Sequence, residues 1–203
     1  MTAEILNLTL EHIELVLVTL AMASCLGLPV AILLTRRASW RTLVLGFVNI
    51  AQTIPSLAMF GFLLPLPLIG GIGKGTAITA LTLYALLPIV RNTLTGLLGV
   101  DASVREAAEA MGMTQRQIFW QVELPLAIPS IVTGLRIATV ATIGTATIAA
   151  AIGGGGLGVF IFRGIAMYDK WTVLAGAVPA AVMAIAADEL LGLIERRLAV
   201  DKR

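Results

Sequence analysis

The 203-residue sequence contains a single cysteine, Cys25, and a single histidine, His12. One cysteine cannot form an internal disulfide, and together with one histidine it offers no metal-binding cluster. His12 has no second ligand or catalytic partner near it in the sequence, so we expect it to be a boundary residue at the edge of an apolar segment. The apolar segments hold no Ser/His, Cys/His or paired-carboxylate arrangement, which argues against an enzyme.

Charged residues are also scarce, at 13% of the chain, whereas 58% of the residues are hydrophobic. This composition, with a mean hydropathy of +0.96, lies outside the usual range of soluble globular domains. The net charge of +2 is too small to suggest a nucleic-acid partner. The sequence therefore predicts an all-α polytopic membrane protein in contact with the lipid bilayer.

Five apolar segments are each long enough to cross a bilayer, which needs about 20 apolar residues. They cover residues 13–35, 42–66, 76–98, 128–152 and 172–194 of a single membrane domain. An odd number of spans places the termini on opposite sides. With residues 99–127 in the cytoplasm, nine basic residues lie inside and three, Lys74, Arg163 and Lys170, lie outside. The positive-inside rule then places the N-terminus outside and the C-terminus in the cytoplasm.

Neither of two glycine-rich stretches matches the nucleotide-binding pattern G-x-x-x-x-G-K-[ST]. Around Gly73-Lys74, Leu68 stands where the first glycine should be and Gly75 where the hydroxyl residue should be. The stretch 153–158 is not followed by Lys-Ser or Lys-Thr. We therefore expect no ATP site, metal or other cofactor on this chain.

The longest polar stretch, residues 99–127, carries signals for two short helices. Ser103 and Glu106 have the spacing of a capping box, which predicts a helix that begins at Ser103. The spacing then places four apolar side chains on one stripe of this helix: Val104, Ala107, Ala108 and Met111. Gly112 can adopt the positive φ that ends a helix. The first helix is therefore short, with two small alanines where another protein can approach closely.

A second capping box, formed by Thr114 and Gln117, predicts a second helix in a new direction. We expect this helix to end at Leu124, because Pro125 follows and proline disrupts a helix interior.

The polar stretch resembles a known signature. Glu106-Ala107-Ala108, three residues, Gly112, nine residues, Val122, one residue and Leu124-Pro125 follow the E-A-A-x3-G-x9-I-x-L-P pattern of the membrane subunits of bacterial ABC importers, with valine in place of the usual isoleucine. The resemblance implies a type I ABC importer permease fold in the bacterial cytoplasmic membrane. It also implies that the first helix is a coupling helix, which docks into a separate ATP-binding subunit. Eight residues are implied in coupling: Ser103, Glu106, Ala107, Ala108, Met111, Gly112, Leu124 and Pro125.

Further partners follow from the same resemblance. They are a second copy of the permease or a sister permease, and an extracytoplasmic substrate-binding protein. ATP and magnesium are expected on the ATP-binding subunit. The alternative for the polar stretch is an amphipathic interfacial helix without a partner.

Four segments, 49–61, 84–95, 144–158 and 161–165, look like one branch of that family in particular, the permeases for glycine betaine, proline betaine, carnitine and choline. Nothing in the spacing or composition specifies a quaternary amine. An importer of the same architecture for amino acids or anions, and a membrane scaffold that works without ATP, therefore remain alternatives.

Polar residues inside the spans are candidates for lining a translocation path. The candidates are Asn49, Gln52, Thr53, Arg91 and Asn92. The first three lie near Pro55, where freed backbone groups need polar partners or water, and they equally suit hydrogen bonds between helices. Arg91 and Arg136 either snorkel to the inner headgroups or form pairs, with Asp188 or Glu189 as the possible partners, and the alternative for both is a direct role in the path.

Overall fold

The computed structural model describes residues 2–66 and 71–200. Leu68, from the nucleotide-binding comparison, and Lys202 and Arg203, two of the nine basic residues counted inside, lie outside the described residues. The helices are α1 (Thr2–Arg36), α2 (Ala38–Thr53), α3 (Ser56–Leu63), α4 (Lys74–Leu98), α5 (Ala102–Ala110), α6 (Gln115–Ile118), α7 (Leu124–Ala146), α8 (Gly158–Ala166) and α9 (Lys170–Val200), with a π-helical segment at Phe119–Glu123 and a 3₁₀ helix at Ile148–Ile152. The described ranges contain no strand, and the predicted all-α class is confirmed.

Four helical stretches in the described ranges are long and apolar enough to cross a membrane, or five spans if a bent pair counts as one. The stretches are Ala3–Arg36, Lys74–Leu98, Gln115–Ala146 and Lys170–Leu198, and the bent pair is α2 with α3. The prediction of about five spans agrees with this count.

The second predicted span, residues 42–66, is bent at its centre. It breaks between Thr53 and Ser56, and α2 and α3 meet at an angle of 104°. The residue before a proline is driven out of the α conformation, and Ile54 before Pro55 accordingly has an extended ψ of 127°.

The predicted helix end at Leu124 and the fourth span, residues 128–152, also need correction. The chain stays helical from Gln115 through Pro125 to Ala146. A π turn accommodates the proline, because the Leu124 N–H bonds the Phe119 carbonyl five residues back. The span then stops at Ala146 and is followed by the separate 3₁₀ helix.

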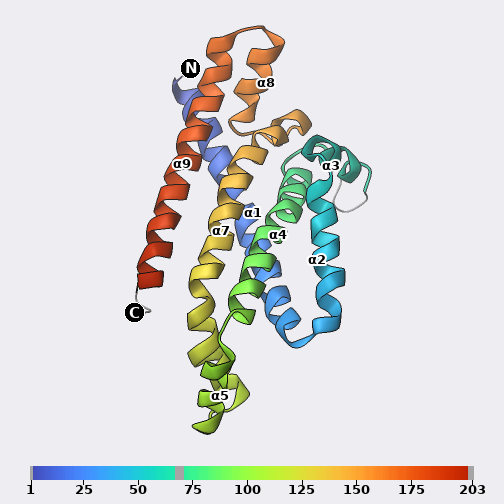
Figure 1. The fold of residues 1–203 in the computed structure, drawn as a ribbon. Coiled ribbons are helices and arrows are strands. Elements are labelled where there is room, and N and C mark those ends of the chain that lie inside the picture. Colours follow the sequence, from blue (N-terminus) through green and yellow to red (C-terminus); the bar gives the residue numbers. More distant parts are fainter. Residues whose placement is uncertain (1, 67–70, 201–203) are drawn as a thin grey trace.

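At the centre of the bundle, α4 packs against α1 on one side and α7 on the other, while α9 packs against α7 and α8 (Figure 1). The core between these helices is rich in alanine, and Ala80, Ala85 and Ala138 are almost completely buried. Small side chains let membrane helices approach closely, which replaces the hydrophobic driving force that lipid cannot supply.

Gly134 shows how close the approach of α4 and α7 is. A Cβ atom at this position would lie 2.7 Å from the Pro88 carbonyl oxygen and 2.8 Å from the Asn92 Cβ. We expect Gly134→Ala to lower the free energy of unfolding by about 1–3 kcal/mol through overpacking. Gly144→Ala, on the same helix with nothing within 4 Å of the new Cβ, is the matched control. Thermal unfolding of the purified complex compares them, and equal melting temperatures would contradict the packing described.

Candidate functional site

The α5 helix lies at the end of the molecule opposite the N-terminus, beyond the ends of the long helices (Figure 1). It begins at Ala102 and not at Ser103, so the first predicted capping box is wrong. The N-cap is Asp101, whose carboxylate accepts a 2.9 Å hydrogen bond from the Ser103 N–H. This backbone hydrogen bond holds the pKa of Asp101 below its usual value. An aspartate side chain caps a helix as well as a serine side chain does. Asp101 lies two residues before Ser103, the predicted N-cap, so the helix begins earlier than predicted.

The other end of α5 agrees with the prediction. Gly112 has a φ of +80°. Its N–H bonds the Glu109 carbonyl and the Met113 N–H bonds the Ala108 carbonyl, which together form a Schellman motif. The predicted capping box of the next helix is confirmed, because the Thr114 and Gln117 side chains each accept a hydrogen bond from the other residue's N–H.

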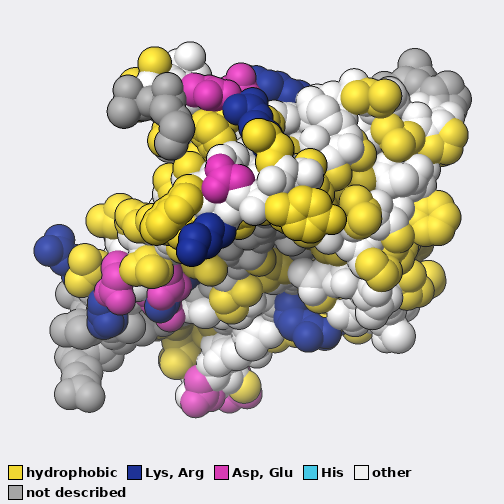
Figure 2. Space-filling model, turned by 90° about the horizontal axis from the view of Figure 1, so that it is seen from above, with side chains coloured by type: hydrophobic (Ala, Val, Ile, Leu, Met, Phe, Trp, Pro, Cys, Tyr) yellow, Lys and Arg dark blue, Asp and Glu magenta, His cyan; other side chains and the backbone are white. Residues whose placement is uncertain are grey.

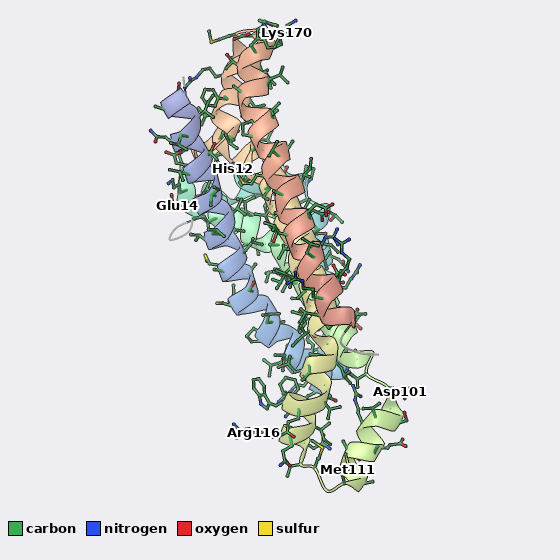
Figure 3. All side chains as sticks on the ribbon, turned by 90° about the vertical axis from the view of Figure 1, so that its left-hand side faces the viewer. His12, Glu14, Asp101, Met111, Arg116 and Lys170 are labelled. Carbon is green, nitrogen blue, oxygen red and sulfur yellow. The ribbon has the colours of Figure 1, made fainter. Side chains whose placement is uncertain are left out.

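The predicted apolar stripe of α5 divides into two faces. Met111 is 75% exposed and points away from the spans in Figure 3, and Val104 and Ala107 are exposed too. Ala108 is only 2% exposed, so it packs inside the loop and is not available to a partner. Ser103 and Glu106 are exposed. Among the residues of the predicted coupling helix named from the sequence, those that a partner can reach are Ser103, Val104, Glu106, Ala107, Met111 and Gly112.

Arg105 ties α5 rigidly to the spans. Its Nη2 donates to the Leu97 carbonyl in the last turn of α4 at 2.8 Å. Its Nε lies 2.8 Å from the Glu123 carboxylate, in the π-helical segment that leads into α7. Both α4 and α7, the most extensively packed helix pair, are thus linked to α5 through one side chain.

Leu124 and Pro125 lie at the start of α7 and not on the accessible face of α5. Leu124 is partly buried against a cluster formed by Leu97, Phe119 and Ala127. Leu124 and Pro125 therefore help to set the direction of α7 relative to the polar loop that precedes it. The structure therefore brings six of the eight predicted coupling residues together in or beside α5.

A second polar region lies at the break between α2 and α3. Because Pro88 has no N–H, the Tyr84 carbonyl four residues earlier lacks its helical donor, and the Gln52 side-chain amide donates to it at 2.9 Å. The Tyr84 hydroxyl in turn donates to the Ile54 carbonyl at the break. Two prolines therefore free backbone groups that polar side chains of the facing helix satisfy.

This region borders a cavity of about 330 Å³. Its lining comes from the break, from α4 and from α7: Gln52, Thr53, Ile54, Pro55, Ser56, Tyr84, Ala85, Ala141, Thr142 and Thr145. Gln52 thus both bonds a neighbouring helix and lines the cavity, so the two alternatives drawn from the sequence are compatible. The Thr53 hydroxyl bonds its own helix at the Ile50 carbonyl.

The other path candidates lie elsewhere. Arg91 is exposed, and its Nη2 donates to the Asn49 side chain at 3.1 Å, which joins α4 to α2. The Asn92 side chain bonds the Pro88 carbonyl and packs where α7 crosses at Gly134. Neither Arg91 nor Asn92 is among the residues that line the cavity.

Arg136 is paired and not snorkelling. Its guanidinium makes two hydrogen bonds to Asp188, at 2.6 and 2.8 Å, and one to Glu195 at 3.2 Å. Glu195 also accepts a 2.8 Å hydrogen bond from the Thr133 hydroxyl. Asp188 was a predicted partner, whereas Glu189 lies 3.7 Å from Arg196 instead. The spacing of seven residues between Asp188 and Glu195 was the available signal, because it puts both on one helix face.

The prediction that His12 is a boundary residue is wrong. Its side chain is completely buried. The Nε2–H group donates to the Ile143 carbonyl at 3.0 Å, and Nδ1 accepts from the Leu157 N–H at 3.4 Å. The adjacent Glu11 accepts from the Gly156 N–H. Through these two hydrogen bonds, neutral His12 connects α1 to α7 and to the loop before α8.

Acidic residues of α1 pair with basic residues at the same end of the molecule. Glu14 lies 2.7 Å from Lys74 at the start of α4, and Glu4 lies 2.7 Å from Arg163 on α8. Figure 2 views this end and shows basic side chains beside acidic ones between larger hydrophobic areas. Two of the three basic residues predicted outside are thus neutralised.

Comparison with known families matches residues 23–200 to the model of the binding-protein-dependent transport system inner membrane component. The match covers most of the chain. The protein belongs to this family of transport permeases. It is therefore an integral, multi-pass component of the inner membrane, as the composition predicted.

Relatives of the permease are similar over nearly its whole length. The choline transport system permease protein OpuBB of Bacillus subtilis is 43% identical over 195 residues, which cover 96% of this chain and 88% of that protein. The glycine betaine/carnitine/choline permease OpuCB of the same organism has the same identity and coverage. The osmoprotectant import permease OsmW of Salmonella typhimurium is 44% identical over 191 residues, covering 91% of this chain and 87% of that one.

Solved structures support the permease fold. The inward-facing methionine ABC transporter MetNI has a chain that superposes with a TM-score of 0.87 at 26% identity, covering 98% of this permease and 97% of that chain. An amino acid ABC transporter superposes with a TM-score of 0.80 at 20% identity, covering 97% and 94%, and supports the fold alone. The predicted ABC importer permease fold is thus confirmed.

Proposed function

We propose that this permease is the membrane-spanning subunit of an ATP-driven importer for osmoprotectants such as glycine betaine, carnitine or choline. It forms the translocation path, and transport is driven by ATP hydrolysis on a separate ATP-binding subunit that binds α5. ATP and magnesium belong to that subunit, and an extracytoplasmic binding protein delivers the cargo. A second copy of this chain, or a sister permease, completes the path.

The anchored geometry of α5 carries the coupling part of this proposal. α5 is a single short helix of nine residues with hydrogen-bonded caps at both ends, so we expect a force on its exposed face to move it as a unit. Arg105 passes that movement to the last turn of α4 and the start of α7. ATP-driven closure of the ATP-binding subunits then shifts the population between inward and outward openings of the path.

The charges support a cytoplasmic α5 with the N-terminus outside. Lys74 and Arg163, at the opposite end, are ion-paired. Arg36 borders the same hollow as Arg105 and Gln115 near α5, and it makes no ion pair within residues 2–66 and 71–200. The positive-inside rule counts lysine and arginine residues and is not a net-charge rule, so it is the larger number of basic residues at the α5 end that favours the cytoplasmic side.

The cargo follows from the relatives, whose names give choline, carnitine and glycine betaine as their substrates. Uptake by cells that carry the complete transporter tests this. Unlabelled choline, carnitine or glycine betaine is expected to abolish uptake of whichever of them is labelled, while methionine has no effect. Inhibition by methionine alone would indicate an amino-acid importer. Uptake that persists after ATP depletion would indicate a protein that works without ATP.

A further inference from the structure

The Arg136 network extends from the interior of α7 to Glu195, just beyond the fifth predicted span, and is not enclosed by the monomer. Arg136 precedes the end of α7 by ten residues, about 15 Å along the helix axis. The side chains of Arg136, Asp188 and Glu195 are 32%, 39% and 26% exposed. They border an open cavity of about 450 Å³ between α7 and α9.

This exposed network is unsuited to lipid. One guanidinium against two carboxylates leaves a formal charge of −1, which the neighbouring Arg196–Glu189 ion pair does not change. Ionisable groups within spans, as Arg136 and Asp188 are, face the bundle interior or a water-filled cavity. The exposed apolar residues of α1, such as Leu17 and Leu26, have no charged residue of this kind among them and suit lipid. The α7–α9 face therefore needs water or protein in front of it.

The network is continuous with the polar cavity at the α2–α3 break. Ala141 lines both cavities. One is the cavity lined by Gln52 and Thr53, and the other is the cavity lined by Arg136 and Asp188. Ile137, Ala141 and Gly144 are exposed along one stripe of α7 between them. These residues recur at intervals of four and three, so they form one helix face.

We infer that this stripe of α7, with the two cavities beside it, is the water-filled wall of the translocation path, and that the Arg136–Asp188–Glu195 network favours cationic cargo on that wall. The inference rests on the proposed function and deepens it. Arg136 holds both carboxylates in fixed positions, while their excess negative charge attracts an ammonium group. A cargo with a net positive charge, such as choline, gains more from this charge than zwitterionic glycine betaine does.

Accessibility to a charged reagent tests the wall without knowledge of the cargo. In a Cys25→Ser background, Ile137→Cys and Ala141→Cys in the assembled transporter are expected to react with a membrane-impermeant trimethylammonium thiosulfonate. Leu26→Cys, on the exposed apolar side of α1, is expected to stay unlabelled, and Ser39→Cys, at the exposed connection between α1 and α2 and outside the docking face, is the positive control in inside-out vesicles. No labelling of either α7 position, with Ser39→Cys labelled, would overturn the inference.

Charge selection is tested by Asp188→Asn, with Glu189→Gln as the matched control. Glu189 carries the same charge on the next residue, but it does not line the cavity. We expect Asp188→Asn to lower the ratio of choline to glycine betaine uptake about tenfold and Glu189→Gln to leave it unchanged. A purely structural role would lower both uptakes equally and overturn the selection.

If Asp188→Asn does not assemble, Glu195→Gln makes the same test, with the same expected fall in the ratio. A wild-type transporter that takes up neither compound would refute the proposed cargo, while the labelling result would still decide the position of the wall.

Discussion

Replacing Gly112 with valine is expected to lower uptake about 5- to 30-fold. The φ of +80° at this position suits glycine, and the left-handed conformation costs other residues about 1–2 kcal/mol. A β-branched side chain is especially unfavourable there. That strain lowers the equilibrium ratio of the correctly shaped loop to its alternatives by a factor of about 5 to 30, which sets the upper limit of the loss of uptake. Since α5 presents the proposed docking face, less ATP-binding subunit should also co-purify with the permease.

Gly46→Val is the matched control for this prediction. Gly46 lies within α2, and a Cβ there has nothing within 4 Å, so the same substitution adds no strain. Uptake and co-purification are measured for both variants at equal amounts of permease in the membrane. If Gly112→Val transports as well as Gly46→Val, the shape of the α5 loop does not matter for coupling.

Replacing His12 with alanine is expected to lower the free energy of unfolding by about 2–5 kcal/mol. The substitution leaves the Ile143 carbonyl and the Leu157 N–H without their side-chain partner in a buried place, and each unsatisfied group costs about 1–3 kcal/mol. Since His12 joins α1 to α7 and to the loop before α8, the loop should also become more accessible to protease. Thermal unfolding of the purified complex and limited proteolysis measure the two effects.

Thr19→Val provides the comparison on the same helix. Thr19 is as completely buried as His12, but its hydroxyl makes no hydrogen bond within the part of the chain that the structure describes. Removing that hydroxyl with a side chain of the same shape is expected to leave the melting temperature unchanged or slightly higher. A loss in Thr19→Val equal to that in His12→Ala would show that burial alone, and not the hydrogen bonds of His12, determines the effect.

The sequence predicted those features that depend on local chemistry. Gly112 ends α5 because a positive φ is a property of the residue itself, and Thr114 caps α6 because its partner Gln117 is three residues away. Asp101 was missed although its signal was equally local. Both Asp101 and Ser103 are residue types that cap helices. Asp101 is the N-cap in the structure, directly before the first helical residue, Ala102.

The remaining features depend on contacts between distant segments. Pro55 breaks a span whereas Pro125 does not, because the π turn before Pro125 accommodates the proline. The partners of His12 are more than 130 residues away along the chain, so spacing gave no indication of them. Ala108 and Ala107 look alike in the sequence, but Ala108 is buried and Ala107 is exposed, which depends on how the chain packs around α5.

The most direct test of the central claim is a site-specific cross-link from α5 to the ATP-binding subunit. A photoreactive residue in place of Met111, which is 75% exposed, is introduced into the assembled transporter, with Trp171 at the opposite end as the control position. The account predicts an adduct with the combined mass of permease and ATP-binding subunit from position 111 and none from position 171. A transport-competent complex that gives no such adduct from position 111, or gives it equally from both positions, would contradict coupling through α5.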